Sequence, residues 1–381
     1  MVVKKKVCLV ATVPVALKVF MREHIVRLSQ TYAITLVCSG DVRELQALFA
    51  GLDVRCVSLD IERKISLLDD CVSLFKLCRF FRAERFAGVH ALMPKSGLLA
   101  MIAAKMVGVP VRVHIFTGQV WSTAIGLKRK VLKAMDILLA ACATHLMADS
   151  PSQRDFLVDE GIVRREKITV LGPGSISGVD GTRFHTDAAA RAAIRTQLNI
   201  PADAVVYLFM ARVTRAKGAI DMVQAFAQMA EVAPLAHLLV VGPDEESLDS
   251  ELSKLLVAFK GRYHRVGFTD RPEDFMASAD VFCLPSYREG FSLATIQAAG
   301  AGLPAIASRI YGLTDAVDEG RTGLMHEPGD IDTIAHCMAR LYADTALREQ
   351  LAEAAQNRAN SSFSQEYIVG QMVLFYQTLW P

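Results

Sequence analysis

Short apolar runs alternate with helical patterns along almost the whole chain, and this alternation constrains the fold more than any other feature. Short apolar runs are typical of buried parallel strands, and the helical segments between them supply the crossovers that parallel strands need. The pattern therefore predicts doubly wound α/β domains. The strand candidates are Val7–Thr12, Ile34–Cys38, Val54–Leu59, Gly88–Leu92, Val111–Phe116, Thr144–Ala148, Ile168–Leu171, Val205–Ala211, His237–Val241, Tyr263–Val266, Val281–Leu284 and Ala305–Ser308. The helical patterns lie at 15–30, 70–86, 97–107, 127–142, 219–232, 249–259, 272–278, 293–301 and 330–357.

A chain of 381 residues is long enough for two such domains, each with its own core. Four glycines between 172 and 181, followed by a polar stretch, place the connection at 173–200. We therefore expect an N-terminal domain over 1–172, a C-terminal domain over 201–364, and an amphipathic last helix from Gln365. Neither domain has the G-x-G-x-x-G fingerprint of dinucleotide-binding dehydrogenases, which argues against that class.

The composition is that of a globular protein, with 52% hydrophobic and 22% charged residues. No apolar run reaches the roughly 18 residues needed to span a bilayer, and the apolar N-terminus is better explained as a first core strand than as a signal peptide. The eight cysteines are scattered, without a Cys-x-x-Cys pair or a metal-ligand spacing. We therefore expect a cytoplasmic protein with reduced thiols and no metal site.

The charge is unevenly distributed. Residues 1–170 hold 25 Lys/Arg and 15 Asp/Glu, an excess of +10, whereas the remainder holds 17 and 25, an excess of −8. The asymmetry indicates that the N-terminal half faces something anionic, and we expect no nucleic-acid partner.

The stretch from Leu284 to Gly312 carries the strongest functional signal. It has the pattern of a strand, a loop, a helix capped by Ser292, a Gly302/Pro304 turn and a second strand. A loop that enters a helix N-terminus is a candidate anion site, because free backbone N–H groups and the positive end of the helix dipole face it. Glu289 lies in this loop, where a carboxylate is better suited to binding hydroxyl groups beside a phosphate than the phosphate itself.

This stretch resembles the signature of the retaining glycosyltransferases of family four, which have the GT-B fold. In that signature a Glu is followed by Gly-Phe, by a second Glu eight positions on, and by a Gly-Leu-Pro turn. Glu289-Gly290-Phe291 and Gly302-Leu303-Pro304 match, whereas Gln297 stands where the second Glu belongs. Other stretches that carry the resemblance are His114–Trp121, Ala148–Ser150 with Gln153 and Arg154, Gly178–Asp180 with Arg183 and Phe184, Arg212 with Lys217 and Gly218, Ser286–Phe291 and Ile310–Asp315.

The resemblance implies two Rossmann-like domains facing across a cleft, with the last helix, 365–381, packing back on the N-terminal domain. It also implies roles for individual residues. Glu289 would bind the donor-sugar hydroxyls, Arg212 and Lys217 the diphosphate, and Gln297 the ribose. The backbone at Gly290, Phe291, Ser292 and Leu293 would complete the phosphate cradle. Arg215 is a further candidate cation.

His114 is predicted to end or follow its strand at the edge of the cleft, where relatives place a His against the donor sugar or acceptor. A purely structural strand-end histidine is an equal alternative. Lys95, Ser96 and Gly97 are predicted to open a helix and are candidates for acceptor contacts.

The expected function is retaining transfer of a hexose or N-acetylhexosamine from a nucleotide-diphosphate sugar, with a UDP-sugar favoured and no further cofactor. The motif forms are most similar to the bacterial capsule, O-antigen and exopolysaccharide subgroup, which implies a lipid-linked or oligosaccharide acceptor. Two alternatives remain open: a catalytically silent sugar-nucleotide-binding protein and a GT-B sugar-nucleotide epimerase.

Two basic amphipathic patterns lie in the N-terminal half. Lys128, Arg129, Lys130 and Lys133 accompany apolar residues over 131–139, and basic residues recur every third position over 76–85. Ordinary domain helices explain the apolar residues equally well. The basic excess predicts peripheral docking on the inner, anionic face of the plasma membrane.

Overall fold

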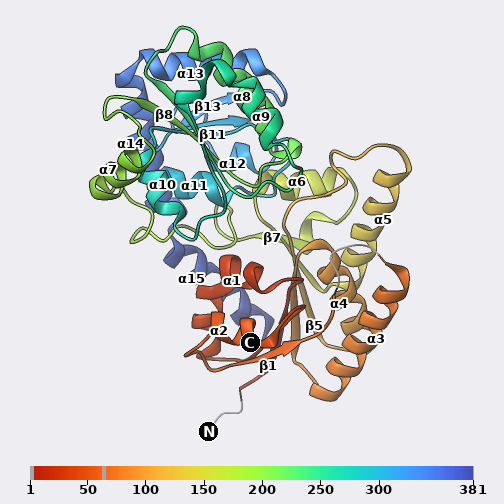
Figure 1. The fold of residues 1–381 in the computed structure, drawn as a ribbon. Coiled ribbons are helices and arrows are strands. Elements are labelled where there is room, and N and C mark those ends of the chain that lie inside the picture. Colours follow the sequence, from red (N-terminus) through yellow and green to blue (C-terminus); the bar gives the residue numbers. More distant parts are fainter. Residues whose placement is uncertain (1–3, 62–65, 381) are drawn as a thin grey trace. The chain divides into compact units, whose positions relative to one another are not determined.

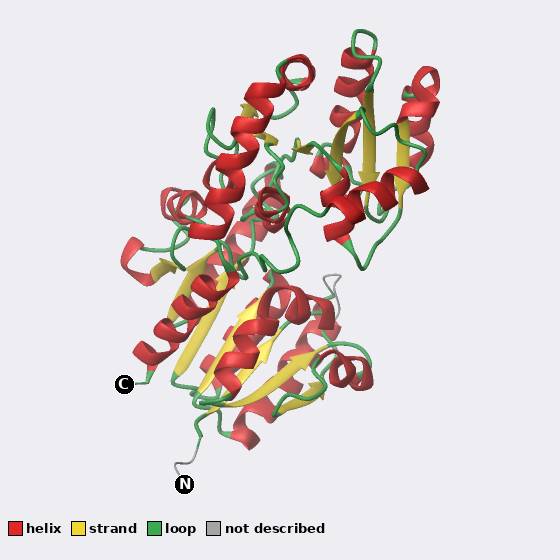
Figure 2. Cartoon of the chain, turned by 90° about the vertical axis from the view of Figure 1, so that its left-hand side faces the viewer, coloured by secondary structure: helices red, strands yellow, loops and turns green. Residues whose placement is uncertain are grey.

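The structure, a computed structural model, describes residues 4–61 and 66–380, and it divides the chain into two compact units. Unit 1 runs up to Ser177 and includes the residues from Glu366 onwards, and unit 2 is Gly178–Gln365. Each unit is a parallel sheet covered by helices, as Figures 1 and 2 show. The predicted pair of doubly wound sheets is confirmed.

Unit 1 contains a seven-stranded parallel sheet with the order β3-β2-β1-β4-β5-β6-β7. The strands are β1 (Lys6–Val10), β2 (Ala33–Cys38), β3 (Val54–Ser58), β4 (Gly88–Leu92), β5 (Val111–Phe116), β6 (His145–Ala148) and β7 (Ile168–Val170). The helices are α1 (Pro14–Ser29), α2 (Val42–Leu48), α3 (Leu67–Glu84), α4 (Pro94–Met106), α5 (Gly126–Cys142), α6 (Pro151–Asp159), η1 (Arg165–Lys167) and the last helix α15 (Gln365–Leu379).

The two faces of this sheet have separate cores because successive strand residues point to opposite sides. Val7 and Leu9 of β1 pack with α1, α2 and α15 on one face, and Cys8 and Val10 pack with α3, α4 and α5 on the other. Helix α15 thus belongs to unit 1, where the Tyr376 hydroxyl lies 2.7 Å from His90 Nδ1. The predicted return of the last helix to the N-terminal domain is confirmed.

Unit 2 contains a six-stranded parallel sheet with the order β10-β9-β8-β11-β12-β13. The strands are β8 (Val205–Met210), β9 (Ala236–Val241), β10 (Tyr263–Val266), β11 (Val281–Leu284), β12 (Ala305–Ser308) and β13 (Gly323–His326). The helices are α7 (Ala188–Gln197), η2 (Arg215–Lys217), α8 (Ala219–Ala230), α9 (Asp249–Leu255), η3 (Val257–Arg262), α10 (Pro272–Ser278), α11 (Leu293–Gly300), α12 (Leu313–Ala316), α13 (Ile331–Ala343) and α14 (Thr345–Ser362).

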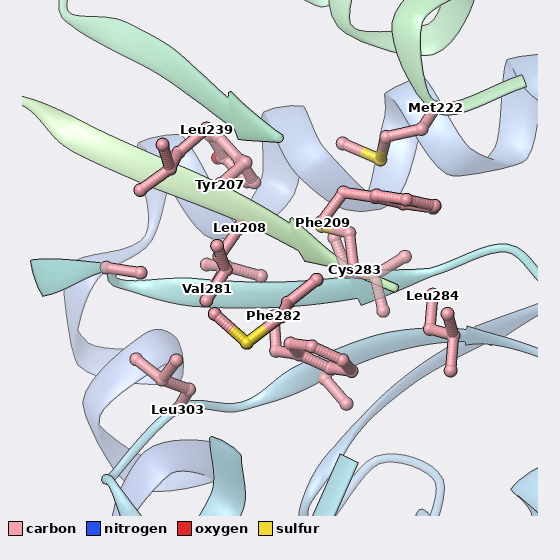
Figure 3. Close-up of a cluster of buried hydrophobic side chains, with 14 of the residues drawn as sticks. Tyr207, Leu208, Phe209, Met222, Leu239, Val281, Phe282, Cys283, Leu284 and Leu303 are labelled. Atoms are coloured by element: carbon pink, nitrogen blue, oxygen red, sulfur yellow. The ribbon is translucent and has the colours of Figure 1, made fainter. Parts of the chain in front are cut away.

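The centre of unit 2 is almost entirely apolar. Helices cover both faces of the sheet, so β11 is buried at every position and reads as a continuous apolar run. Figure 3 shows Phe209 and Phe282 among the packed side chains. The one polar group of the labelled cluster, the Tyr207 hydroxyl, donates a 2.7 Å hydrogen bond to the Met338 carbonyl.

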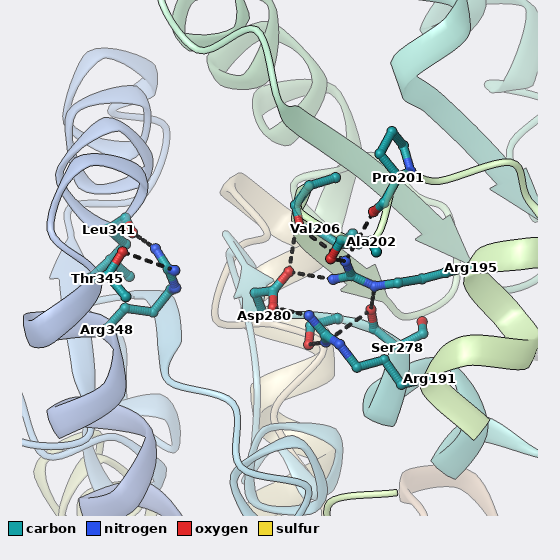
Figure 4. Close-up of polar contacts among 12 residues, drawn as sticks. Arg191, Arg195, Pro201, Ala202, Val206, Ser278, Asp280, Leu341, Thr345 and Arg348 are labelled. Carbon is teal, nitrogen blue, oxygen red and sulfur yellow. Dashed lines mark hydrogen bonds and ion pairs between the residues drawn. The ribbon is translucent and has the colours of Figure 1, made fainter. Parts of the chain in front are cut away.

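A partly buried ion-pair cluster attaches α7 to the sheet of unit 2. Asp280, just before β11, accepts hydrogen bonds from Arg191 at 2.6 Å, from Arg195 at 2.7 Å and from the Val206 amide at 2.7 Å (Figure 4). The Arg195 side chain is 5% exposed and also donates to nearby carbonyls, so every charge in the cluster has partners. The predicted connection over 173–200 therefore includes a helix that is part of unit 2, and the unit boundary falls between Ser177 and Gly178.

Several predicted elements differ from the structure. The single helix predicted over 330–357 is two helices, because Asp344 adopts non-helical backbone angles and caps α14 by accepting from the Leu347 amide. Strand β13 and the helices α2, α6, α7 and α12 were not predicted. These segments contain few apolar residues, or mix them with polar residues, so that neither a helical nor a strand period is clear in the sequence.

Three buried histidines make unit 1 sensitive to acid. His24, His90 and His114 are each 1% exposed, and burial lowers their pKa to about 4, about 3 and about 3. A folded-state pKa below the unfolded value of 6.5 means that protonation favours unfolding, so stability is complete above pH 6.5 and falls as the pH decreases towards 4. With three such groups we expect a slope of about 4 kcal/mol per pH unit within this window.

The slope is measurable by denaturant unfolding followed through tryptophan fluorescence, because Trp121 and Trp380 both lie in unit 1. His24→Gln keeps a donor for the Ile176 carbonyl and should reduce the slope by about one third. The exposed His185→Gln is the matched control and should leave it unchanged. An unaltered slope in His24→Gln would contradict the assignment.

Candidate active site

The candidate site of unit 2 lies where the strand order reverses. Strands β8 and β11 are neighbours in the sheet, and their connections run to opposite sides of it. In open α/β sheets, ligands bind at the carboxyl ends of the strands at such a switch point. The loops that leave these two strands, 211–218 and 285–292, carry most of the residues selected from the sequence.

The two loops are held together by close backbone contacts. Gly218 has a φ of +72°, and a Cβ at this position would lie 2.0 Å from the Pro285 carbonyl oxygen. The Tyr287 amide donates to the Ala216 carbonyl at 2.9 Å, and the Ser286 hydroxyl donates to the same carbonyl at 3.2 Å. Only glycine fits at 218, so the loops form one rigid platform.

Lys217 and Glu289 form the central ion pair of this platform. Lys217 Nζ lies 2.5 Å from Glu289 Oε1, and the two side chains are 19% and 10% exposed. A short charge-assisted hydrogen bond away from water fixes both groups. The arrangement presents a cation and a carboxylate side by side, which suits a ligand that carries both phosphate and hydroxyl groups.

Arg212 and Arg215 point to other partners. Arg212 pairs with Glu245 at 2.6 Å and Arg215 with Glu251 at 2.7 Å, and all four side chains are more than 40% exposed. Arg212 is therefore in the loop as predicted but is not bonded to Glu289. Exposed pairs of this kind are weak, so either arginine can change partner at little cost.

Helix α11 supplies backbone donors beside the ion pair. Ser292 is its N-cap, and its side chain accepts from the Thr295 amide at 3.2 Å, which confirms the predicted helix start. The first N–H groups of a helix have no partner within it, so the backbone at Phe291, Ser292 and Leu293 offers donors for an anion. Gly290 packs closely against Gly312 of the next loop.

Gln297 lies on α11 and is half-buried. Its carboxamide makes no hydrogen bond with any residue that the structure describes, so it is available to a ligand. A carboxamide can accept one hydrogen bond and donate one, where a carboxylate would only accept.

Arg288 is a candidate that the sequence analysis missed. Its backbone is held by hydrogen bonds with the Ser286 hydroxyl, and its side chain is half-buried next to the charges of Glu289 and Arg212. Burial is the main cause that lowers the pKa of its guanidinium. The sequence signal that could have identified Arg288 is its position directly before Glu289 in the motif.

Unit 1 has a corresponding switch point between β1 and β4. The Thr12 hydroxyl after β1 donates to the Ser96 hydroxyl at the start of α4, at 3.1 Å. Met93, which precedes α4, has a φ of +70°, an uncommon conformation for a residue with a side chain that tends to occur at functional sites. Lys95 pairs with Asp70 at 2.6 Å. Lys95, Ser96 and Gly97 thus open a helix at this edge, as predicted.

His114 is not at the edge of its domain, and the prediction that it ends or follows its strand is wrong. It is the fourth residue of β5 and 1% exposed, with its ring against Gly97 and edge-to-face with Phe116 at 4.8 Å. A histidine within a buried strand packs beneath α4, and burial keeps its pKa low. This burial agrees with the structural alternative, but the buried His114 Nδ1 has no hydrogen-bond partner in the part of the chain that the structure describes, so its contact with donor or acceptor stays a prediction.

Within residues 4–61 and 66–380, no group of three or more His, Cys, Asp or Glu side chains is placed to hold a metal ion. All eight cysteines are free thiols.

The close fit at Gly218 generates a stability prediction. Gly218→Ala should destabilise unit 2 by several kcal/mol, because the added methyl group overlaps the Pro285 carbonyl in addition to the roughly 1–2 kcal/mol cost of a positive φ. Gly320→Ala is the matched control, since Gly320 has a φ of +74° and open space around it, and should cost only that conformational term. Chemical denaturation measures the loss in the free energy of unfolding for both variants. Equal losses would mean that the two loops are not in close contact.

The chain was compared with known proteins. Residues 190–358 match the family described as "Glycosyl transferases group 1", and residues 20–174 match the "Glycosyl transferase 4-like domain". A capsular polysaccharide biosynthesis glycosyltransferase of Staphylococcus aureus is 30% identical over 323 residues, which cover 84% of each chain. The UDP-Gal:alpha-D-GlcNAc-diphosphoundecaprenol alpha-1,3-galactosyltransferase of Escherichia coli is 29% identical over 293 residues, or 75% of this chain and 74% of that protein.

Among solved structures, the Anabaena protein HepE in complex with UDP and glucose superposes with a TM-score of 0.84 and 18% identity, over 98% of this chain and all of that one. At this identity the similarity concerns the fold alone, and it agrees with the two parallel sheets seen here. The similarity to the S. aureus protein extends over most of both chains. The chain therefore belongs to the group 1 glycosyltransferases, it has their GT-B fold, and it is a glycosyltransferase.

Proposed function

We propose that this glycosyltransferase moves a hexose or N-acetylhexosamine, with retention of configuration, from a UDP-sugar to a lipid-linked glycan in bacterial surface polysaccharide synthesis. The observation that carries the proposal is the Lys217–Glu289 pair beside the N-terminus of α11. The S. aureus and E. coli relatives, named for capsular polysaccharide and for a diphosphoundecaprenol-linked acceptor, support the acceptor class.

The donor binds unit 2. Lys217 and the backbone N–H groups at the start of α11 contact the diphosphate, with Arg212 and Arg288 as further cations. Glu289 accepts hydrogen bonds from the sugar hydroxyls, and Gln297 binds the ribose with one accepted and one donated hydrogen bond. A UDP-sugar is favoured because the E. coli relative is named for UDP-Gal and the Anabaena structure contains UDP.

In the transfer step the bond between the anomeric carbon and the diphosphate oxygen breaks, and a bond to the acceptor oxygen forms on the same face of the sugar. The acceptor proton passes to the departing diphosphate oxygen. Negative charge grows on the diphosphate as it leaves, so Lys217 and the α11 amides stabilise the transition state more than the ground state. These groups neutralise the leaving group without a metal ion.

Lys217→Ala should reduce transfer about a hundredfold, because loss of one contact to developing charge costs roughly 3 kcal/mol. Arg215→Ala is the matched control: it removes the same charge from the same loop, but its side chain pairs with Glu251 of α9 and, unlike Arg212, is not among the charges that act on Arg288 beside Glu289. The rate of this variant should stay within about twofold of the wild type. UDP release from a panel of UDP-, GDP- and ADP-sugars, with a lipid-diphosphate-linked acceptor, measures both effects. Wild-type turnover in Lys217→Ala would remove the lysine from the site.

A lipid-linked acceptor requires that unit 1 reach a membrane. Large apolar side chains are exposed near the N-termini of two of its helices, namely Leu67 and Leu68 of α3, and Ile125, Leu127 and Val131 at α5; each is at least 50% exposed, as is Phe75 halfway along α3. Helices α3, α4 and α5 lie side by side on one face of the sheet (Figure 1). Each helix follows a parallel strand, so these N-termini are at the carboxyl edge of the sheet, the edge that holds the acceptor loops.

The structure separates the four basic residues predicted to dock on the membrane into two pairs. Arg129 and Lys133 both bond to Glu160 at 2.7 Å and lie over the Trp121 ring, so an anionic membrane would have to compete with these partners for their charge. Lys128 and Lys130 are exposed, and neither forms an ion pair with a described carboxylate. We propose that they act with the exposed apolar residues on an anionic leaflet. No helix within the described residues is long and apolar enough to span a bilayer.

Lys128→Gln/Lys130→Gln should weaken binding to phosphatidylglycerol-containing vesicles about thirtyfold at low salt, at about 1 kcal/mol for each basic side chain. Arg129→Gln/Lys133→Gln removes the same charge from the same helix and should have a much smaller effect. Vesicle co-sedimentation compares the two, and high salt should release the wild type. If the wild type stays in the supernatant at low salt, membrane docking is refuted and a soluble acceptor becomes the better hypothesis.

A further inference from the structure

A second hollow lies in unit 1, at the amino ends of β6 and β7. It has a volume of about 450 Å³ and is lined by Thr144, His145, Arg164, Lys167, Thr169 and Phe375, among others. Substrate loops in α/β sheets leave the carboxyl ends of strands, so this hollow is at the opposite edge of the sheet from the β1/β4 switch point. It is separate from both sites described above.

The hollow is surrounded by cations without carboxylate partners. Lys105 and Arg112 do not line the hollow but, like Lys167, they bond to the last carbonyls of α5. Neither these three residues nor His145 and Arg164 form an ion pair with a carboxylate of the described chain. The adjacent Arg165, in contrast, pairs with Asp155 at 2.8 Å. We define these five residues, Lys105, Arg112, His145, Arg164 and Lys167, as the basic cluster.

The cluster repels itself. Burial and then the charges of Lys105 and Arg112 lower the pKa of Lys167, and burial followed by Lys167 and Arg112 lowers the pKa of His145. Mutual repulsion of this kind raises the free energy of the folded protein unless something negative offsets it. A persistent uncompensated cluster in a hollow is characteristic of a site for an anion.

Part of the positive charge of the basic cluster is explained by its contacts with the C-terminus of α5. The last carbonyls of α5 accept from three of its members: Lys167 to Ala140, Lys105 to Ala141 at 3.1 Å, and Arg112 to Cys142 at 2.7 Å. The C-terminus of a helix carries only about half a negative charge, however, against three full positive ones. Glu166, which also lines the hollow, contributes one further negative charge, and Arg164 contributes one more positive charge. Well over one positive charge remains uncompensated.

We propose that this hollow binds a phosphoryl group with two or more negative charges, carried by a lipid headgroup or by a soluble phosphate compound. Arg164 and Lys167 supply charge and hydrogen-bond donors, whereas the hydroxyls of Thr144 and Thr169 donate to the Arg112 and Leu146 carbonyls. The volume exceeds that of a phosphate or diphosphate, and Phe375, which packs edge-to-face on His145 at 6.1 Å, offers an apolar wall for the rest of the ligand.

His145 provides a local readout, because the charges of Lys167 and Arg112 act on it, Phe375 packs against its ring, and the Thr144 hydroxyl lies 2.9 Å from its Nδ1. With histidine side chains labelled for NMR, and with the His145 signal assigned through His145→Asn, inorganic pyrophosphate should bind saturably and raise the pKa of His145. The anion stabilises the imidazolium and screens its cationic neighbours. Arg164→Gln/Lys167→Gln should abolish this response, whereas the charge-matched Lys5→Gln/Arg27→Gln, two exposed cations elsewhere in unit 1, should retain it.

Three further comparisons keep the test decisive. Arg164→Gln alone replaces an exposed side chain and weakens the response even if loss of the Lys167 cap unfolds the double variant. Arg212→Ala/Lys217→Ala should leave the response unchanged, which separates this site from the proposed donor site. Vesicles that contain phosphatidic acid, whose phosphomonoester headgroup can carry two negative charges, distinguish the sources: parallel loss of vesicle binding in Arg164→Gln/Lys167→Gln identifies a lipid headgroup, and loss of pyrophosphate binding alone identifies a soluble ligand. A His145 signal that does not respond to pyrophosphate overturns the proposal.

Discussion

The contact between the loops after β8 and β11 is the constraint on which the donor side of this protein depends. Gly218 allows the first loop to lie against Pro285, and the Ala216 carbonyl accepts from Ser286 and Tyr287 of the second. That contact brings Lys217 within 2.5 Å of Glu289, although the two are 72 residues apart in the sequence. Lys217 and Glu289 are largely shielded from water and compensate each other's charge. A ligand that displaces one of them must therefore offer the other an opposite charge or new hydrogen bonds.

Both units use the same architecture for different purposes. In unit 2 the switch point between β8 and β11 collects cations, a carboxylate and helix N–H groups, a combination suited to a sugar diphosphate. In unit 1 the corresponding point between β1 and β4 is formed by hydroxyls and by Met93 in a strained conformation. The positive charge of unit 1 lies elsewhere, at the start of α5 and in the basic cluster behind β6 and β7. Its excess of basic residues thus has separate locations rather than one basic face.

Ion pairing decided which of the predicted cations remain available. Lys128 and Lys130 are exposed at α5, whereas Arg129 and Lys133 are bound to Glu160, the residue that caps the C-terminus of α6. Likewise Arg212, Arg215 and Lys217 occupy one short loop but pair with three different carboxylates. Basic residues that are neighbours in the sequence have different ion-pair partners because their side chains point in different directions. Each pairs with the carboxylate that the tertiary fold places next to it.

The sequence by itself determined the fold class, most strands, the cap at Ser292 and the loops that carry Lys217 and Glu289, because these follow from local apolar periodicity and from a contiguous motif. Only the tertiary structure decided that α7 belongs to unit 2, since Asp280 binds Arg191 and Arg195 from nearly 90 residues away. It also placed His114 within a buried strand rather than at its edge. The basic cluster was likewise invisible in the sequence, because its members come from α4, β5, β6 and the segment around η1, and their proximity depends on sheet order. Long-range pairing is set by packing, which no local pattern encodes.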